Sequence, residues 1–267
     1  MSQATHGHVA RKRFGQNFLN NPQVIDDIVN AVNPQADSVV VEIGPGLGAL
    51  TEPLLQRVTH LHVVELDRDL IARLRKRWPA ERLTVHEGDA LRFDFGTIAP
   101  RYKIVGNLPY NISTPLLFHL ATFADQVEDM HFMLQKEVVE RMVAEPGCAD
   151  YGRLGLMLQY YFSMEKLLDV PPGCFSPPPK VDSAVVRLIP YQTLPYPAQD
   201  VAVLSQLLTE AFSQRRKTIR NTLRGWFDEA TLVNQGIDPS WRPENLTLAQ
   251  YVALANFAVD HGHKPNK

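Results

Sequence analysis

The stretch Ser38-Val-Val-Val-Glu-Ile-Gly-Pro-Gly-Leu-Gly-Ala-Leu-Thr51 decides the fold of this chain. Its valine run breaks into a glycine-rich turn and then resumes with helical spacing. This pattern predicts a buried parallel strand, a tight turn and the start of a helix. Glycine suits the turn because it adopts positive φ and lets a ligand approach the backbone. The turn has the shape of a nucleotide cradle, although a turn that only packs a helix against a sheet fits it as well.

The spacing of the glycines separates this turn from two common nucleotide motifs. Gly44, Gly46 and Gly48 form Gly-x-Gly-x-Gly. The dinucleotide fingerprint is Gly-x-Gly-x-x-Gly, and a phosphate-binding loop ends in Gly-Lys followed by Ser or Thr. Neither template fits, so the rest of the chain has to identify the ligand.

Composition narrows the class of protein. The chain has 267 residues, a formal net charge of -2 and two cysteines, enough residues for a large domain with a smaller one. Contact with nucleic acid would need a local basic patch, because the net charge does not attract a polyanion. Without Cys-x-x-Cys spacing, a secretory signal or a long apolar run, we expect a soluble protein in a reducing cytoplasm.

The N-terminal region has two parts ahead of the glycine turn. Residues 1–13 are basic and predict a mobile basic arm, with a solvated tail as the alternative. The segment 13–19 combines two aromatic residues, two carboxamides and a glycine, which favours a lid that packs on a planar ligand. Asn21-Pro22 then begins an amphipathic helix that ends at Asn33-Pro34.

Strands and helices alternate after the glycine turn. This order predicts a parallel, doubly wound α/β sheet, with later strands at 61–67, 83–86, 102–105, 131–134 and 183–189. The proline-rich segment 171–180 predicts a rigid loop. We therefore expect a catalytic domain over 1–190, a linker over 191–198 and a small helical domain over 199–267.

Polar residues follow the strands of this predicted sheet, where doubly wound folds bind ligands. Glu42, Glu65, Asp89 and Asn107 all fall at or near strand ends, so we expect one crevice to hold them. Glu65 is placed to accept both hydroxyls of a ribose, or else to cap the next helix. Asp89 is placed to accept from the amino group of an adenine, or else to close a turn.

The string Asn107-Leu108-Pro109-Tyr110 is the most informative four-residue motif. The Asn107 side-chain oxygen and the Leu108 carbonyl can accept the two hydrogens of an exocyclic purine amine and favour its pyramidal geometry. Tyr110 offers a ring face to a base swung out of its stack. The alternative is an ordinary Asn-x-Pro turn.

The sequence gives little support for a metal site or a nucleophilic cysteine. No His and Cys residues fall at metal-ligand spacing, and neither cysteine has an evident base partner. In the C-terminal region, cations at helical spacing oppose an apolar stripe, which favours a helix that docks on RNA phosphates. A solvated charged face is the alternative. The cations are Arg215, Arg216, Lys217, Arg220 and Arg224.

Over essentially its whole length the chain resembles the KsgA/RsmA family of small-subunit ribosomal RNA adenine dimethyltransferases. Eight strings carry the resemblance, in the family's order. They are Phe14-Gly15-Gln16-Asn17-Phe18-Leu19, Glu42-Ile43-Gly44-Pro45-Gly46-Leu47-Gly48, Glu65-Leu66-Asp67, Gly88-Asp89-Ala90, Asn107-Leu108-Pro109-Tyr110, Gln135-Lys136-Glu137-Val138, Phe175-Ser176-Pro177-Pro178-Pro179-Lys180-Val181-Asp182-Ser183 and Phe212-Ser213-Gln214-Arg215-Arg216-Lys217.

The resemblance implies a Rossmann-like class I methyltransferase domain with a smaller all-α domain, and S-adenosyl-L-methionine as cofactor. It implies two methyl groups on N6 of each of two adjacent adenosines, in a hairpin loop near the 3′ end of small-subunit RNA. Phe175 is then a second wall of the base pocket, opposite Tyr110. The implied cofactor contacts are Asn17, Leu19, Gly44, Glu65, Asp89 and Asn107.

We expect the partner to be small-subunit RNA within an immature small ribosomal subunit, and the protein to be a cytoplasmic monomer without a membrane contact. Two rivals are an adenine methyltransferase of the resistance type that acts on large-subunit RNA, and an assembly factor whose binding role outweighs catalysis. A dehydrogenase is a third, which titration with a nicotinamide cofactor would detect.

Overall fold

The computed structural model describes residues 4–5, 8–9, 17–214 and 216–262. They fall into two compact units, Met1–Val139 with Ser163–Pro190, and Glu140–Phe162 with Tyr191–Lys267. Within the region of the expected basic arm, β1 (Ala4–Thr5) and β2 (His8–Val9) pair in an antiparallel manner. The rest of that arm, residues 14–16 of the expected lid and Arg215 lie outside the described residues.

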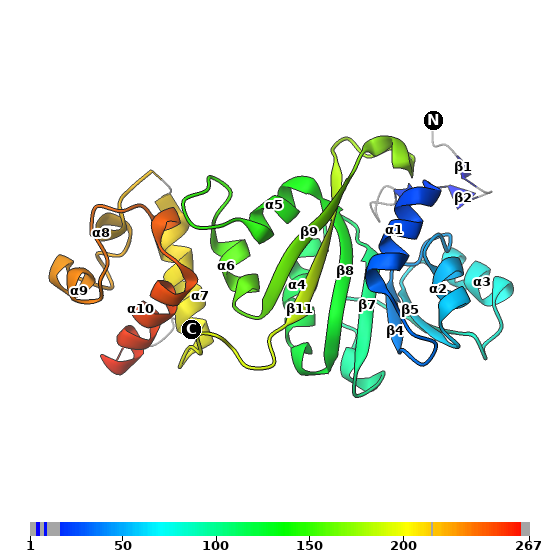
Figure 1. Cartoon of the computed structure of the whole chain (residues 1–267), viewed down its shortest axis with the longest axis horizontal. Coiled ribbons are helices and arrows are strands. Elements are labelled where there is room, and N and C mark those ends of the chain that lie inside the picture. Colours follow the sequence, from blue (N-terminus) through cyan, green and yellow to red (C-terminus); the bar gives the residue numbers. More distant parts are fainter. Residues whose placement is uncertain (1–3, 6–7, 10–16, 215, 263–267) are drawn as a thin grey trace. The chain divides into compact units, whose positions relative to one another are not determined.

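The first unit is built on a seven-stranded sheet in the order β6-β5-β4-β7-β8-β11-β9. The pairs β6-β5, β5-β4, β4-β7 and β7-β8 are parallel, whereas β11 runs antiparallel to β8. Figure 1 shows this sheet with helices packed on it. The strands are β4 (Val40–Ile43), β5 (Leu61–Glu65), β6 (Leu83–Glu87), β7 (Tyr102–Asn107), β8 (Val127–Gln135), β9 (Phe162–Val170) and β11 (Ser183–Pro190).

The predicted α/β sheet is confirmed, with three differences. The sequence predicted a parallel sheet, whereas β11 runs antiparallel to β8. β8 begins at Val127 and not near His131, and β9 was not predicted. The first part of β8 was not predicted because Glu128 and Asp129 interrupt its apolar run. Along β9 most positions are exposed or half-buried, so its sequence lacks the apolar run of a central strand.

Helices cover the sheet through apolar side chains. α1 (Pro22–Val32) begins at the predicted cap, where the Asn21 side chain accepts from the Val24 N–H, and α2 (Thr51–Arg57) follows the glycine turn. Residues of α1 and α2 pack with those of the central strands in one buried cluster that includes Ile28, Leu54 and Val105. The other helices of this unit are α3 (Arg68–Arg77), α4 (Ser113–Ala121) and the first part of α5 (Lys136–Val143).

A short ribbon joins two segments that are distant in sequence. β3 (Phe18–Leu19) pairs antiparallel with β10 (Phe175–Ser176), with Leu19 opposite Phe175. The Asn20 N–H donates to the Cys174 carbonyl at 2.9 Å, which extends the connection. The ribbon therefore ties the end of the predicted lid to the proline-rich loop.

The second unit is helical. It contains α6 (Arg153–Gln159), α7 (Val201–Ala211), α8 (Ile219–Thr222), α9 (Glu229–Asn234) and α10 (Leu248–Asp260). Residues 140–162 belong to this unit, although the sequence analysis placed them in the catalytic domain. The reason is that α6 packs against α7, and the Tyr160 hydroxyl accepts from the Ala198 N–H at 3.1 Å. None of the described helices is long and apolar enough to cross a membrane.

Candidate active site

A cavity of about 350 Å³ lies at the carboxyl ends of the parallel strands. Its walls come from β3, the glycine turn after β4, the end of β5, the segment after β6 and the segment after β7. β4 pairs with β5 on one side and with β7 on the other, so the connections after these strands diverge and leave a crevice. The cavity therefore lies where the topology of a doubly wound sheet predicts a ligand.

The glycine turn and the strand beside it need residues without a Cβ. Gly46 has φ of +59°, and a Cβ there would lie 3.1 Å from Cδ1 of Phe18. Gly106 precedes Asn107 on β7, and its Cβ would lie 2.6 Å from the Ile43 carbonyl oxygen. Glycine at both positions lets the aromatic ring and the two strands approach closely enough to form the cavity.

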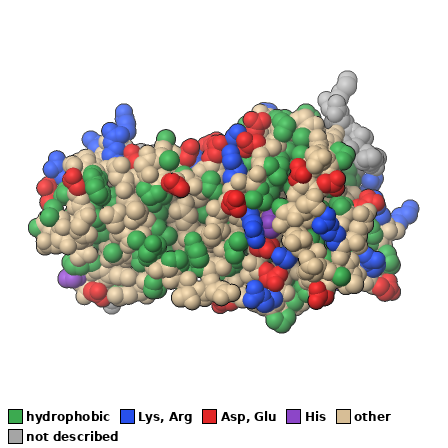
Figure 2. Space-filling model, in the orientation of Figure 1, with side chains coloured by type: hydrophobic (Ala, Val, Ile, Leu, Met, Phe, Trp, Pro, Cys, Tyr) green, Lys and Arg blue, Asp and Glu red, His purple; other side chains and the backbone are tan. Residues whose placement is uncertain are grey.

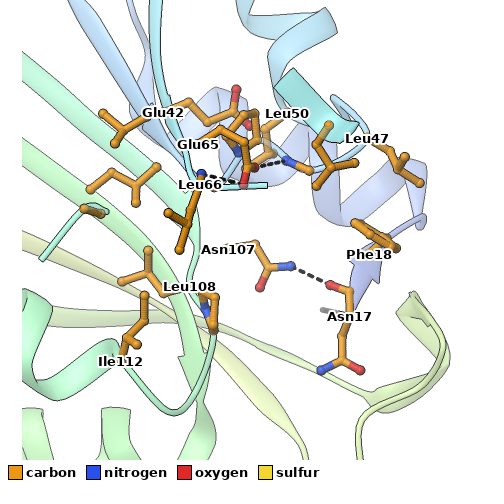
Figure 3. A pocket seen from close by; sticks show the side chains of 18 of the residues that line it. Asn17, Phe18, Glu42, Leu47, Leu50, Glu65, Leu66, Asn107, Leu108 and Ile112 are labelled. Carbon is orange, nitrogen blue, oxygen red and sulfur yellow. Dashed lines mark hydrogen bonds between the residues drawn. The ribbon is translucent and has the colours of Figure 1, made fainter. Parts of the chain in front are cut away.

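Glu65 ends β5 with its carboxylate held by backbone donors (Figure 3). Its Oε1 accepts from the N–H groups of Leu66 and Asp67 at 2.8 and 2.9 Å. Its Oε2 accepts from the Gly46 N–H at 3.4 Å, which links β5 to the glycine turn. Burial raises the pKa of Glu65, and these three backbone bonds oppose that rise. A carboxylate has about four lone-pair positions, so capacity remains for a ligand hydroxyl.

Glu42 lies on the same side of the cavity but in a different environment. The side chain is 2% exposed, and its Oε2 accepts from the Thr51 hydroxyl at 2.6 Å. Burial raises the pKa of Glu42 to about 8. The Glu65 carboxylate therefore accepts from three backbone donors, whereas the Glu42 carboxylate accepts from one hydroxyl.

Asp89 follows β6 and also lines the cavity. Its Oδ1 accepts from the Leu91 N–H at 3.0 Å, and its carbonyl accepts from the N–H groups of Arg92 and Phe93. Asp89 thus closes the turn at the strand exit, and its half-buried side chain still faces the cavity. The two predicted roles of this residue are compatible.

The orientation of the Asn107 side chain is fixed from across the cavity. Its Nδ2 donates to the carbonyl of Asn17 at 2.9 Å (Figure 3). An amide that donates through Nδ2 has its Oδ1 left as an acceptor. The Leu108 N–H donates to the Met133 carbonyl at 3.2 Å, which anchors the next peptide on β8. The roles predicted for the Asn107 oxygen and the Leu108 carbonyl as acceptors stay a prediction.

Tyr110 lines the cavity, whereas Phe175 does not. The Tyr110 hydroxyl and the Ser183 hydroxyl are hydrogen-bonded at 2.7 Å, and burial raises the pKa of Tyr110. Phe175 is 4% exposed and belongs to the same buried cluster as Leu19. Its role as the second wall of a base pocket stays a prediction.

Phe18 and Leu66 are among the cavity residues that were not predicted as site residues. Phe18 packs on the glycine turn, whereas the aromatic content of the 13–19 segment favoured a ring that packs on a planar ligand. Leu66 is 50% exposed although it is apolar, and it lies at the cavity next to Glu65 (Figure 3). An apolar residue directly after a strand-end carboxylate was the signal that could have identified it.

The predicted cationic helix is interrupted in the structure. α8 has only four residues, with Thr218 as its N-cap and Leu223 as its C-cap. Arg216, Lys217 and Arg224 are exposed outside this helix. In Figure 2, Lys and Arg side chains project from the helical unit. The Arg220 guanidinium lies 3.2 Å from the Glu229 carboxylate, so part of its charge is already compensated.

The part of the chain that the structure describes contains no candidate metal centre. Among those residues, no group of three or more His, Cys, Asp or Glu side chains could hold a metal ion. The cavity instead combines strand-end carboxylates, an amide and an apolar wall.

Comparison with known proteins gives a consistent result. The family model described as ribosomal RNA adenine dimethylase matches residues 7–260. "Ribosomal RNA small subunit methyltransferase A" of Laribacter hongkongensis is 64% identical over 259 residues, which cover 96% of this chain and 98% of that protein.

Two solved structures are similar over most of their length. A dimethyladenosine transferase from Plasmodium falciparum has a TM-score of 0.76 and 29% identity, covering 89% of this chain and 95% of that chain. The 23S rRNA methyltransferase ErmE has a TM-score of 0.70 and 25% identity, covering 91% of this chain and 100% of that chain.

Proposed function

Because the chain belongs to the ribosomal RNA adenine dimethylase family, we propose that it dimethylates N6 of two adjacent adenosines in small-subunit ribosomal RNA. The proposed target is the hairpin loop near the 3′ end of that RNA. The observation that carries the mechanism is the contact between Asn107 Nδ2 and the Asn17 carbonyl, because it directs the Asn107 oxygen toward an incoming amine.

The cavity residues fit S-adenosylmethionine as methyl donor. Glu65 keeps acceptor capacity for ribose hydroxyls beside its three backbone bonds. Asp89 offers a carboxylate to an adenine amine, and Leu66 offers an apolar surface to its ring. Asn17, Leu19 and Gly44 complete the proposed contacts. When bound, the cofactor supplies an electrophilic methyl group on its sulfonium.

The residues after β7 position the adenosine amine. Its nitrogen lone pair is delocalised into the purine ring, so the amine becomes nucleophilic only as the nitrogen turns pyramidal. The Asn107 oxygen and the Leu108 carbonyl accept its two hydrogens and stabilise the positive charge that develops. No general base is needed, because the alkylated amine is acidic enough to lose its proton to water.

Aromatic residues hold the base in this proposal. Tyr110 provides one wall, and its hydrogen bond to Ser183 keeps the ring in place. Phe175 provides the second wall when its ring leaves the buried cluster that it shares with Leu19. Because Leu19 pairs with Phe175 across the β3-β10 ribbon, such a movement would change both sides of the cavity together.

The helical unit contacts RNA phosphates in this proposal. Arg216, Lys217 and Arg224 are exposed there, and arginine and lysine side chains bind phosphates without sequence preference. We place the substrate in an immature small ribosomal subunit and the protein, as a monomer, in the cytoplasm.

The Asn107→Ala variant tests the assignment. With labelled S-adenosylmethionine and immature small subunits, we expect loss of methylation at the two adenosines, mapped by nuclease digestion, while RNA affinity stays within about twofold of the wild type. Asn111→Ala is the matched control, since Asn111 also lines the cavity but is exposed. Near-normal turnover by Asn107→Ala would sink the assignment.

The similarity to ErmE keeps large-subunit RNA as a second candidate substrate. Primer extension on both ribosomal RNAs separates the two, because a dimethylated adenine cannot form a Watson–Crick pair and stops the polymerase just before it. An assembly role that outweighs catalysis predicts that Asn107→Ala restores subunit assembly in cells that lack the protein. Failure to restore assembly would exclude that role.

A further inference from the structure

We infer that Glu42 carries a proton in the ligand-free protein and releases it when the cationic cofactor binds, so that cofactor affinity rises with pH. The inference rests on the proposed function, because it assumes S-adenosylmethionine in the cavity. It assigns a role to a residue that the proposed mechanism leaves unused.

The burial of Glu42 is the first argument. The residue is 2% exposed, yet it lines the cavity. Among the described residues, the Thr51 hydroxyl donates to its carboxylate at 2.6 Å. A buried carboxylate is costly when ionised unless cations or several donors surround it. With a single hydroxyl donor, the protonated form of Glu42 is the stable one.

The groups that face Glu42 do not offset a negative charge. Val63 of β5 and Val105 of β7 lie opposite it in the sheet register, and α2 contributes Thr51. Among the described residues, the charged group that acts on the pKa of Glu42 is Glu65, which has the same sign. None of the described Lys, Arg or His residues forms an ion pair with Glu42.

Burial raises the pKa of Glu42 to about 8, the Thr51 hydrogen bond opposes this rise, and the charge of Glu65 adds to it. Glu65 has three backbone donors on its carboxylate. The two neighbouring carboxylates are thus held differently, and Glu42 is the one that retains a proton near neutral pH.

The proposed cofactor brings the missing positive charge. S-adenosylmethionine carries a sulfonium, an ammonium and a carboxylate, which leave it with a net positive charge. An opposite charge within about 4–6 Å lowers the pKa of a carboxyl by roughly 1–3 units. At pH 7 roughly 90% of a group with a pKa near 8 is protonated, so a fall of 1–3 units in that pKa on binding should release roughly 0.4–0.9 proton per site.

Calorimetric titration of S-adenosylmethionine in buffers of different ionisation enthalpy counts the released protons. The test compares the wild type with Glu42→Gln, which keeps an acceptor for Thr51 but cannot ionise. At pH 7 we expect the wild type to release roughly 0.4–0.9 proton more than Glu42→Gln, and at pH 9 we expect a difference of about 0.1 proton or less. The amino group of the cofactor titrates equally in both experiments, so the difference isolates Glu42.

Affinity gives a second readout of the same linkage. Between pH 6 and pH 8, wild-type affinity should rise by up to about tenfold per pH unit relative to Glu42→Gln. Thr51→Val provides an independent variant, because loss of its hydroxyl raises the pKa of Glu42 further. Proton release at pH 8 should then increase from roughly half a proton to nearly one.

The outcomes separate this inference from the proposed function. Absence of cofactor binding by the wild type would overturn both. Binding with equal proton release by wild type and Glu42→Gln would overturn the inference alone. If Glu42→Gln does not fold, an unchanged proton count in Thr51→Val at pH 8 would overturn it as well.

Discussion

Replacement of Gly106 by alanine tests whether close contact between β4 and β7 positions the active site. A Cβ at this position would lie 2.6 Å from the Ile43 carbonyl oxygen and 3.2 Å from Cδ2 of Leu108. The first contact is with backbone and cannot be relieved by a rotamer change. β4 and β7 must therefore separate at the point where Asn107 begins the catalytic segment.

The size of the effect follows from this geometry. Overpacking of a tight interior costs about 1–3 kcal/mol. For a protein of this size, each kcal/mol lowers Tm by about 2–4 °C, so the variant should melt about 2–12 °C below the wild type. A displacement of about 1 Å at reacting groups can reduce the rate about 100-fold, and we expect a loss of roughly 10- to 100-fold in single-turnover methylation.

Calorimetry and single-turnover methylation at saturating cofactor measure the two effects separately. Gly173→Ala is the matched control, since no neighbouring atom lies within 4 Å of its added Cβ. The control should keep the wild-type Tm and rate. A Gly106→Ala protein with both values unchanged would refute the reasoning.

Three further predictions concern pH, RNA affinity and the base pocket. Burial, followed by His60 and His86, lowers the pKa of His62 to about 4, so the unfolded chain takes up a proton that the folded protein refuses. The free energy of unfolding should therefore fall as pH drops from about 6.5 to about 4, and urea titrations at pH 7, 6 and 5 should show a smaller fall for His62→Gln. Arg216→Ala and Lys217→Ala should each weaken RNA binding and lower the slope of log affinity against log salt by about 1, as filter binding at several salt concentrations would show; an unchanged slope would remove these residues from the interface. Tyr110→Phe keeps the ring but loses its hydroxyl, so methylation should fall about 10-fold or less, and a loss as large as that of Asn107→Ala would contradict a role limited to stacking.

The sequence predicted the parts of the fold that depend on local pattern. The valine run before Gly44 and the apolar run of 61–66 form strands because fully buried parallel strands are continuously apolar. Polar residues at the ends of these strands lie at one edge of the sheet as a consequence of parallel topology. The predicted crevice is present for this reason. Each strand was predicted from its own local pattern, and the parallel topology brings the strand ends together.

Contacts between distant segments could not be predicted in the same way. Asn107 and Asn17 are 90 residues apart, and no local pattern indicates that one directs the other. The pairing of Leu19 with Phe175 could not be predicted from the sequence either, because a two-residue strand is too short to show a periodic pattern. Phe175 is buried beside that pairing, and the resemblance to the family, with no local pattern, supplied its role as a wall of the base pocket, which stays a prediction.

The helical unit shows a limit of another kind. Cations at 215–224 have helical spacing, yet only Ile219–Thr222 is helical as α8. A nearby loop supplies the competing contacts, since the Trp241 carbonyl accepts from the Ile219 N–H at 2.6 Å and the Pro239 carbonyl accepts from the Arg220 N–H. Tertiary hydrogen bonds thus replace the bonds that a longer helix would have made.

The β3-β10 ribbon also sets when the site is completed during synthesis. The described residues that line the cavity lie between Asn17 and Ile112, but the strand that pairs with β3 is complete only when Ser176 has been made. At about 5–20 residues per second, roughly 8 to 30 seconds pass between the synthesis of β3 and the synthesis of β10. A protein proposed to modify small ribosomal subunits therefore finishes its own cofactor cavity only after a ribosome has translated about two thirds of it.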